Sequence, residues 1–428
     1  MKIYFNEEHI LLRDMVREFA INEIRPHAQN VDTGQFPTES IKKMSELGLM
    51  GIPWDEKYGG NGMDTIALVI AIEELGKECA STAATMMAHT SLGTTPIAVF
   101  GTDEQKAKYL PDLCSGKMLG AFGLTEPNAG SDAGNTQTRA VKNGDGYVIN
   151  GQKAFCTNAG YAGTIIITAV VDDGTDGNQI GAYNDEKGTE GLRIGEPEDK
   201  MGWKGSDTRS VYFEDMYIPK ENVLGNPSKG FKQFLRTLTG GRITIGALAL
   251  GTAQGAYERA LKYSCEREAF GKQINKFQAI SFKLADMATS IEASKHLVYN
   301  AAYLKDKGED IIKELKLKNV RIEKTLTGDH YDLVEKKVKV HADRFKRKSL
   351  TSISIMCHEI GHAIQHAQNY SPLITRTKLV KNTQWINKIS LAIIYIGFPL
   401  IFATGSLSLI KFCASIILLS TFIGVIIH

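Results

Sequence analysis

Residues 358–362, with the sequence HEIGH, have the types and spacing that suit a zinc ion. His358 and His362 stand four residues apart, so a helix would direct both imidazoles toward one ion. Glu359 follows the first histidine, where its carboxylate could activate a metal-bound water as a general base. The stretch therefore predicts hydrolytic zinc chemistry, with Glu359 as the catalytic residue and the two histidines as metal ligands.

A third protein ligand for this ion does not follow from the sequence. His366 lies eight residues beyond His358, which on one helix corresponds to about 12 Å. Zinc–nitrogen bonds are about 2 Å long, so both imidazoles cannot reach one ion. The other candidates stay unplaced: Asp329, His330, His341 and His428. A site of two histidines and water would bind zinc weakly, and a helix with solvated histidines is the alternative.

A second set of motifs lies between residues 123 and 288. It comprises GLTEPNAGSD at 123–132, KAFCTNAG at 153–160, MGWKGSDTRSVYFEDMYIP at 201–219, GGRITIGA at 240–247 and EREAFGKQINKFQAISFKLADMA at 266–288. Hydroxyls such as those of Thr125 and Thr157 can hydrogen-bond the heteroatoms of a ring, and Arg267 can contact a diphosphate with two N–H groups. No G-x-G-x-x-G fingerprint occurs, so a Rossmann dinucleotide site is not predicted.

In this order the five motifs resemble those of the acyl-CoA dehydrogenase family, of the short-chain, butyryl-CoA type, over about residues 1–313. The resemblance implies FAD as the cofactor, an acyl-CoA substrate and electron-transfer flavoprotein as the electron acceptor. It implies cofactor contacts by Phe122, Leu124, Thr125, Ser131, Phe155, Thr157, Arg267, Phe270 and Gln278, and substrate contacts by Ser131, Gly240, Gly241 and Arg242. Taken singly, each residue also has a structural interpretation, such as a core aromatic for Phe155.

The sequence departs from the family pattern in two ways. Asn135, Thr239 and the pair Asn184-Asp185 replace typical residues and predict weaker binding within an intact fold. The second departure concerns the base that removes the substrate's α-proton, a glutamate in a YEGT segment of the family, because no YEGT occurs here. General-base catalysis contributes roughly 10²–10⁴-fold, so we expect impaired dehydrogenation. An FGGYG stretch and the last bundle helices are also missing, which makes a family-type tetramer doubtful.

Residues 317–428 resemble a membrane-associated family of neutral zinc metallopeptidases. The resemblance depends on LTGDHYDLVEKKVKVHADRF at 326–345, HEIGHAIQHAQNYSPL at 358–373 and the apolar stretches that follow. It implies a zinc cofactor and a zincin-like helix. It begins inside that family's domain and stops before the glutamate that we expect as the third ligand, so this part is interpreted as a fragment.

Two apolar stretches, Ile389–Ile410 and Phe412–Ile427, are separated only by Lys411. Each is near the length of about 20 residues that spans a bilayer, which predicts a transmembrane helical hairpin; a buried helical pair is the alternative. The lysines before residue 389 would keep that side cytoplasmic, and the N-terminus has no signal-peptide pattern. We therefore expect a cytoplasmic N-terminal portion that is anchored to the cell membrane by the hairpin.

The elements that must position these residues follow from hydrophobic periodicity and turn signals. Residues 1–118 predict an all-α domain, with helices at Glu7–Ile24, Thr38–Leu47, Thr65–Cys79, Ala83–Phe100 and Thr102–Cys114. Residues 119–228 predict an antiparallel β middle domain, with strands at Gln137–Lys142, Gly146–Asn150, Thr164–Val171, Ile180–Tyr183 and Ser210–Met216. Residues 229–314 predict a truncated C-terminal helical bundle, with a hairpin formed by Ile243–Phe270 and Gln278 to about Lys307.

The predicted fold class is therefore α+β, followed by a zinc metallopeptidase-like fragment at 315–385 and the transmembrane hairpin at 386–428. Residues 315–428 carry 16 Lys and Arg against 6 Asp and Glu, although the whole chain has a net charge of only +2. No nucleic-acid partner is expected. We interpret the chain as a chimera of two truncated enzymes. The alternatives are a membrane-tethered zinc metallopeptidase with a passenger portion, and an inactive module that binds FAD and acyl-CoA.

Overall fold

The computed structural model describes residues 5–172, 179–226 and 229–308, and in addition three short strands between residues 321 and 341. It divides into two compact units, Met1–Gly308 and Glu309–His428, which are described separately. The predicted zinc site, Glu359 with His358 and His362, lies outside the described residues. The predicted hairpin at 386–428 also lies outside them.

The first part of the larger unit is helical, as the periodicity predicts. Its helices are α1 (Glu7–Phe19), α2 (Ala28–Asp32), α3 (Thr38–Glu46), α4 (Thr65–Glu78), α5 (Ala80–Ala88), α6 (Thr95–Phe100) and α7 (Asp103–Cys114). α4 is buried on all sides from Thr65 to Lys77, which fits a central helix. The single helix predicted at 83–100 is instead interrupted by a π-helical turn, His89–Thr94. Pro96 explains the interruption, because it has no N–H to donate and its ring displaces the preceding turn.

A seven-stranded sheet follows: β1 (Leu119–Gly123), β2 (Arg139–Asn143), β3 (Gly146–Thr157), β4 (Ala162–Asp172), β5 (Gln179–Glu186), β6 (Leu192–Pro197) and β7 (Thr208–Ile218). The strand order is β1-β4-β2-β3-β7-β6, with β5 paired to β4. The predicted antiparallel sheet is partly wrong, because β1 and β2 both pair with β4 in parallel. Parallel partners need a long connection rather than a tight turn, so turn signals could not reveal them.

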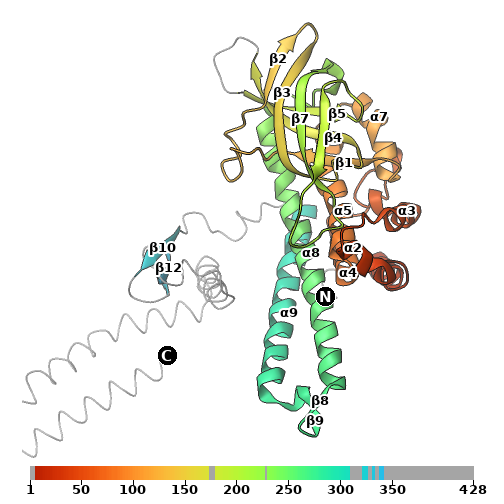
Figure 1. Ribbon diagram of the computed structural model, residues 1–428, viewed down its shortest axis with the longest axis vertical. Coiled ribbons are helices and arrows are strands. Elements are labelled where there is room, and N and C mark those ends of the chain that lie inside the picture. Colours follow the sequence, from red (N-terminus) through yellow and green to blue (C-terminus); the bar gives the residue numbers. More distant parts are fainter. Residues whose placement is uncertain are drawn as a thin grey trace, which may run out of the picture. The chain divides into compact units, whose positions relative to one another are not determined.

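Two long helices, α8 (Gly230–Glu266) and α9 (Gln278–Asp306), form the predicted hairpin and lie side by side (Figure 1). Between them are two short strands, β8 (Glu268–Ala269) and β9 (Lys272–Gln273). α8 begins 13 residues earlier than Ile243, where the sequence predicted its start. It packs closely on α4, because a Cβ on Gly251 or Gly255 would lie only 2.3 or 2.2 Å from a backbone oxygen of that helix.

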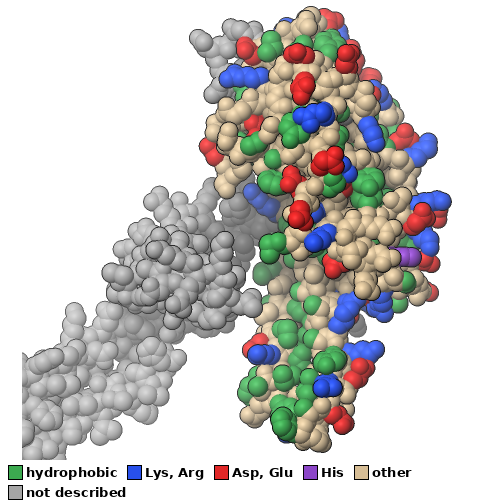
Figure 2. All heavy atoms as spheres, viewed as in Figure 1, with side chains coloured by type: hydrophobic (Ala, Val, Ile, Leu, Met, Phe, Trp, Pro, Cys, Tyr) green, Lys and Arg blue, Asp and Glu red, His purple; other side chains and the backbone are tan. Residues whose placement is uncertain are grey.

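The end of α9 is hydrogen-bonded to the start of α4. The Asp306 carboxylate accepts hydrogen bonds from the backbone N–H groups of Thr65, at 2.9 Å, and Ile66, at 3.3 Å. These N–H groups have no partner inside the helix, and a negative charge is favourable at that end. Apolar side chains gather along the hairpin in Figure 2, and its exposed members include Tyr263, Phe282 and Leu297.

A cluster of buried residues joins the helices to the sheet. Ile97, Leu113 and Phe234 pack there with Ile166 of β4. The Phe122 ring of β1 stacks on Phe234 of α8, with ring centroids 4.2 Å apart. This contact fixes the start of α8 against the end of β1, beside the candidate site.

In the smaller unit the described strands are β10 (Arg321–Thr325), β11 (His330–Asp332) and β12 (Lys337–His341). β12 pairs with β10 in parallel and with β11 in antiparallel orientation. In the described parts of the chain, no helix is long and apolar enough to cross a bilayer. This finding contradicts the predicted location, a cytoplasmic portion anchored to the cell membrane.

Candidate functional site

The ends of β1 and β3 form a small cavity together with α5, the π-helical turn and α8. Its volume is about 170 Å³, and we call it the interstrand cavity; its lining consists of Ala88, Leu92, Phe122, Leu124, Thr125, Ala154, Phe155, Thr157 and Leu238. Five of the predicted cofactor-binding residues therefore lie together. They come from two motifs that are about 30 residues apart in the sequence, and the sheet brings those motifs side by side.

Phe155 has an unusual conformation at this cavity. Its φ is 55°, in the left-handed region, where a bulky side chain is strained. The pairing of β3 with β7 shifts register between Lys153 and Cys156, and this bulge leaves Phe155 with 64% of its surface exposed. Strain of this kind costs about 1–3 kcal/mol and is found mainly at functional sites.

The chemistry of the interstrand cavity suits a flat ring with polar edges. Thr125 and Thr157 provide hydroxyls that can donate and accept hydrogen bonds, while the leucines and Phe155 provide apolar contact. Among the described residues that line the cavity, none has a titratable side chain. The cavity is thus equipped to bind and orient a ring rather than to transfer a proton.

A buried ion pair lies directly behind the cavity wall. The Lys153 ammonium is 2.6 Å from the Glu126 carboxylate. Burial alone raises the pKa of Glu126, but the charge of Lys153 and hydrogen bonds from Lys153, Thr138 and Gln137 bring this pKa below its ordinary value. Glu126 is therefore ionised at neutral pH.

The predicted substrate-binding residues are not part of the described lining of the cavity. Ser131 and Arg242 are exposed, the first on the loop after Glu126 and the second on α8. Gly241 is beside the cavity, because a Cβ there would meet the Leu92 side chain at 2.8 Å. Gly240 faces away, since its nearest neighbour would be the Lys305 side chain at 3.5 Å.

Three predicted cofactor-binding residues are far from the cavity, at the hairpin tip, which we define as residues 267–278. Arg267 follows the last residue of α8, and the helix separates it from Leu238 by about 40 Å. Phe270 has a φ of 51° and is 96% exposed, and Gln278 begins α9. One chain therefore does not bring the tip and the cavity together, and a ligand that contacts both would need two chains.

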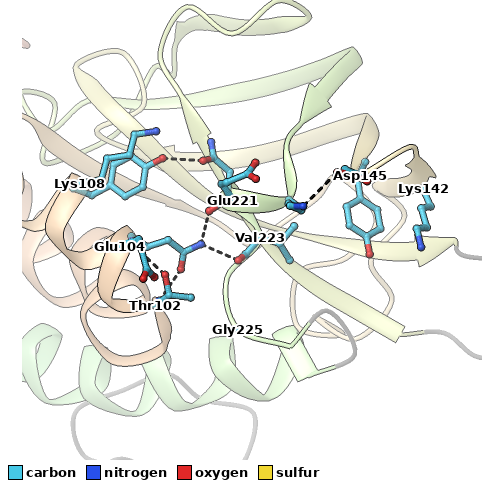
Figure 3. A pocket seen from close by; sticks show the side chains of 13 residues that line it. Thr102, Glu104, Lys108, Lys142, Asp145, Glu221, Val223 and Gly225 are labelled. Carbon is cyan, nitrogen blue, oxygen red and sulfur yellow. Dashed lines mark hydrogen bonds and ion pairs between the residues drawn. The ribbon is translucent and has the colours of Figure 1, made fainter.

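A larger hollow of about 700 Å³ lies between α7, the β2–β3 turn and the segment before α8 (Figure 3). The Gln105 side chain donates to the backbone oxygens of Glu221 and Val223, at 2.6 and 2.9 Å. The Lys220 ammonium lies 3.3 Å from the Asp145 carboxylate. No predicted site residue lines this hollow. Its polar groups join α7 to the segment after β7, and that segment to the β2–β3 turn. We therefore do not assign it as the functional site.

Several residues of the site gave no recognisable signal in the sequence. Leu92 and Leu238 line the cavity from helical segments, where they resemble ordinary core leucines. Lys153 stands within a motif that was recognised, yet nothing indicated that its charge is buried. In the part of the chain that the structure describes, no group of three or more His, Cys, Asp or Glu residues could hold a metal.

Models of three consecutive protein domains match residues between 6 and 328. The N-terminal, middle and C-terminal domain models of acyl-CoA dehydrogenases match residues 6–117, 121–216 and 228–328. A model of neutral zinc metallopeptidases matches residues 296–427 and overlaps the last of these. The two predicted family resemblances thus agree with the matched families, whereas nothing in the matches shows a membrane location.

Known proteins extend this result. Over 316 residues, 73% of this chain and 83% of the relative, the chain is 54% identical to the "Probable acyl-CoA dehydrogenase YngJ" of Bacillus subtilis. Butyryl-CoA dehydrogenase from Megasphaera elsdenii has a similar structure, with a TM-score of 0.69 and 43% identity over 72% of this chain and 81% of that one. An acyl-CoA dehydrogenase from Bacillus anthracis, solved in complex with FAD, also has a similar structure. Its TM-score is 0.68, and it is 36% identical over 71% of this chain and 52% of that one. This chain belongs to the acyl-CoA dehydrogenase family.

Proposed function

We propose that the larger unit binds FAD and a short-chain acyl-CoA thioester and is built for α,β-dehydrogenation of that thioester. The observation that carries this proposal is the interstrand cavity, where Phe122, Leu124 and Thr125 face Phe155 and Thr157. The similarity to a butyryl-CoA dehydrogenase supports the short acyl chain. The complex of a relative with FAD supports the cofactor.

The residues present fit a flavin. Phe155 is exposed although it is aromatic, and it is held in a strained conformation that has no evident use in the core. Thr125 lies on the segment after β1 and Thr157 is the last residue of β3, so the two hydroxyls can hydrogen-bond a ring from two different segments of the cavity lining. A bound flavin would supply an acceptor for the hydride that leaves the substrate's β-carbon.

The substrate contacts are proposed for the surface next to the cavity. Arg242 is exposed on α8 one turn after Leu238, where its guanidinium can bind a phosphate group of coenzyme A. Gly241 has no side chain and therefore leaves room for Leu92 at the cavity wall. Ser131 can hydrogen-bond either ligand from its loop. Arg267, Phe270 and Gln278 are proposed to reach the FAD of a second chain.

We expect dehydrogenation by this chain to be slow. The reaction needs a base for the α-proton, and the described lining of the cavity has none. The loss of a positioned base corresponds to roughly 10²–10⁴-fold in rate. Electron-transfer flavoprotein would be the acceptor for any electrons that reach the flavin.

Titration of the purified full-length protein with FAD and then with butyryl-CoA tests this function. We expect a yellow protein whose flavin absorbance changes when butyryl-CoA binds but bleaches slowly. Protein that takes up no flavin would refute the proposed function. Rapid bleaching of the flavin absorbance would refute the inference that the base is missing. If butyryl-CoA causes no change in this absorbance, the chain would be a module that binds only FAD.

A second activity is proposed for residues 296–427 because the zinc metallopeptidase model matches them. His358 and His362 would bind zinc, and Glu359 would activate a water molecule. Zinc content and chelator-sensitive cleavage of casein measure this activity in the full-length chain. The Glu359→Gln variant should keep the zinc and lose the cleavage. Equal cleavage by both proteins would show that Glu359 is not the base.

A further inference from the structure

The buried ion pair behind the interstrand cavity connects the two segments that form its wall. Glu126 directly follows Thr125, and Lys153 directly precedes Ala154. The side chain of Lys153 is 0% exposed and that of Glu126 is 2% exposed. Thr125 and Ala154 line the cavity, and the next residue on the far side of each, Glu126 or Lys153, belongs to the ion pair.

The contacts of this pair reach four strands. The Lys153 ammonium, on β3, also donates to the Thr168 hydroxyl of β4 at 3.1 Å, and lies 3.4 Å from the Leu124 carbonyl after β1. The Glu126 carboxylate accepts from the backbone N–H groups of Gln137, at 2.6 Å, and Thr138, at 3.2 Å, which lead into β2. Charged hydrogen bonds of this kind are short and directional, so they fix the distance between the segments.

The wall itself depends on that distance. The Ala154 N–H donates to the Thr125 carbonyl at 2.7 Å, and this is a direct bond between the two sides of the cavity. The stem of Lys153 packs against Gly123, because a Cβ there would lie 3.1 Å from its Cγ. A change of the Lys153 side chain would therefore alter the spacing of Thr125 and Phe155, which stand on either side.

Stability alone does not account for a charged pair at this place. Replacement of a buried ion pair by uncharged groups of the same size is often neutral or stabilising. We propose that Lys153 and Glu126 are positioning residues, which hold Leu124 and Thr125 at the distance from Phe155 and Thr157 that flavin binding requires. This inference rests on the proposed function, because it concerns the affinity for FAD.

The larger unit contains a matched control for this pair. The Lys295 ammonium of α9 lies 2.6 Å from the Glu73 carboxylate of α4, with side chains that are 16% and 1% exposed. The Tyr299 hydroxyl donates to the same carboxylate at 2.6 Å. None of these three residues lines the interstrand cavity, so Lys295→Met removes a comparable ion pair without touching its wall.

The experiment measures the dissociation constant of FAD by fluorescence titration of the flavin-free full-length protein, together with the melting temperature. The variants are Lys153→Met, Glu126→Gln, the double variant Lys153→Met/Glu126→Gln and the control Lys295→Met. We expect Lys153→Met and Lys295→Met to lower the melting temperature similarly, while only Lys153→Met raises the dissociation constant, by about tenfold, or about 1.4 kcal/mol. The double variant has no buried charge, so it should melt nearer to the wild type and still bind FAD weakly.

The outcomes separate the two proposals. If the wild type binds FAD and the double variant binds it equally well, the positioning role is refuted and the proposed function stands. If Lys295→Met weakens FAD binding as much as Lys153→Met does, the effect is one of general stability and the positioning role is again refuted. If the wild type binds no FAD, the proposed function fails, and this inference fails with it. Should Lys153→Met not fold, the double variant and Glu126→Gln decide the question.

Discussion

Acid should destabilise the larger unit through His89, a fully buried histidine. Its side chain lies in the π-helical turn and is completely buried. Nδ1 accepts a hydrogen bond from the backbone N–H of Gly120 at 2.9 Å, so Nε2 must carry the proton that is donated to the Leu113 carbonyl at 3.1 Å. A proton on Nδ1 would face the Gly120 N–H, and burial lowers the pKa of His89 from 6.5 to about 4.

The direction of the effect follows from proton linkage. Between pH 6.5 and 4 the unfolded chain binds a proton at this histidine and the folded chain does not, so the free energy of unfolding falls as the pH falls. Each pKa unit is worth about 1.4 kcal/mol, so the complete loss is about 3 kcal/mol. It is absent above pH 6.5, reaches about 2 kcal/mol at pH 5 and is complete below pH 4.

Urea unfolding of the full-length chain, followed by circular dichroism at several pH values between 7.5 and 5, measures this loss. The His89→Gln variant is the control, because glutamine retains a donor and an acceptor but cannot be protonated. It should be less stable than the wild type at pH 7.5 and should lose about 2 kcal/mol less on acidification to pH 5. Carboxylates titrate alike in both proteins, so identical losses would refute the assignment of the acid effect to His89.

Three further predictions concern other sites. Gly255→Ala should lower the free energy of unfolding by about 1–3 kcal/mol, because its Cβ would lie 2.2 Å from the backbone oxygen of Lys77. Thermal melts measure this loss. Gly202→Ala is the control and should have little effect, because a Cβ there would have no atom within 4 Å. Asp306→Ala should lower that free energy by about 1 kcal/mol through loss of the cap on α4, and an unchanged melt would show that solvent satisfies those N–H groups. Phe155→Gly should raise the melting temperature by removing left-handed strain while it weakens FAD binding, and a lower melting temperature would mean that the exposed ring contributes to packing.

Hydrophobic periodicity predicted most helices because their packing is local. The predicted helix Thr65–Cys79 agrees with α4 within one residue, and the predicted hairpin of long helices is present as α8 and α9. Pro96 was the available signal for the interruption at 89–94. Helical periodicity was recognised from Phe231, but the long helix was predicted to begin at Ile243, after Gly240-Gly241, a pair of low helix propensity. In the structure α8 continues through this pair, and Leu92 lies beside Gly241.

The sheet was predicted only where strands are adjacent in the sequence. The turn at Asn143–Gly146 identified β2 and β3, which pair in antiparallel orientation. The parallel pair of β1 and β4 has about 40 residues between its strands, so no local pattern marks it. This pairing is nevertheless what brings Phe122 and Thr125 to the cavity.

Motif order identified candidate site residues but not their grouping in space. Phe155 and Thr125 meet at the interstrand cavity, whereas Arg267 and Phe270 lie about 40 Å away along α8. The sequence predicts the length of such a helix, but it does not show whether a second chain lies against the hairpin tip. Lys153 shows the other limit, because a lysine in a strand is normally expected to be exposed.

The end of α9 and the start of α4 depend on the same carboxylate. Asp306 lies only two residues before the boundary at Gly308, and its carboxylate holds the last turn of α9 against the first turn of α4. The last turn of α9 therefore cannot unwind without uncapping α4, so the two helix ends should fray together.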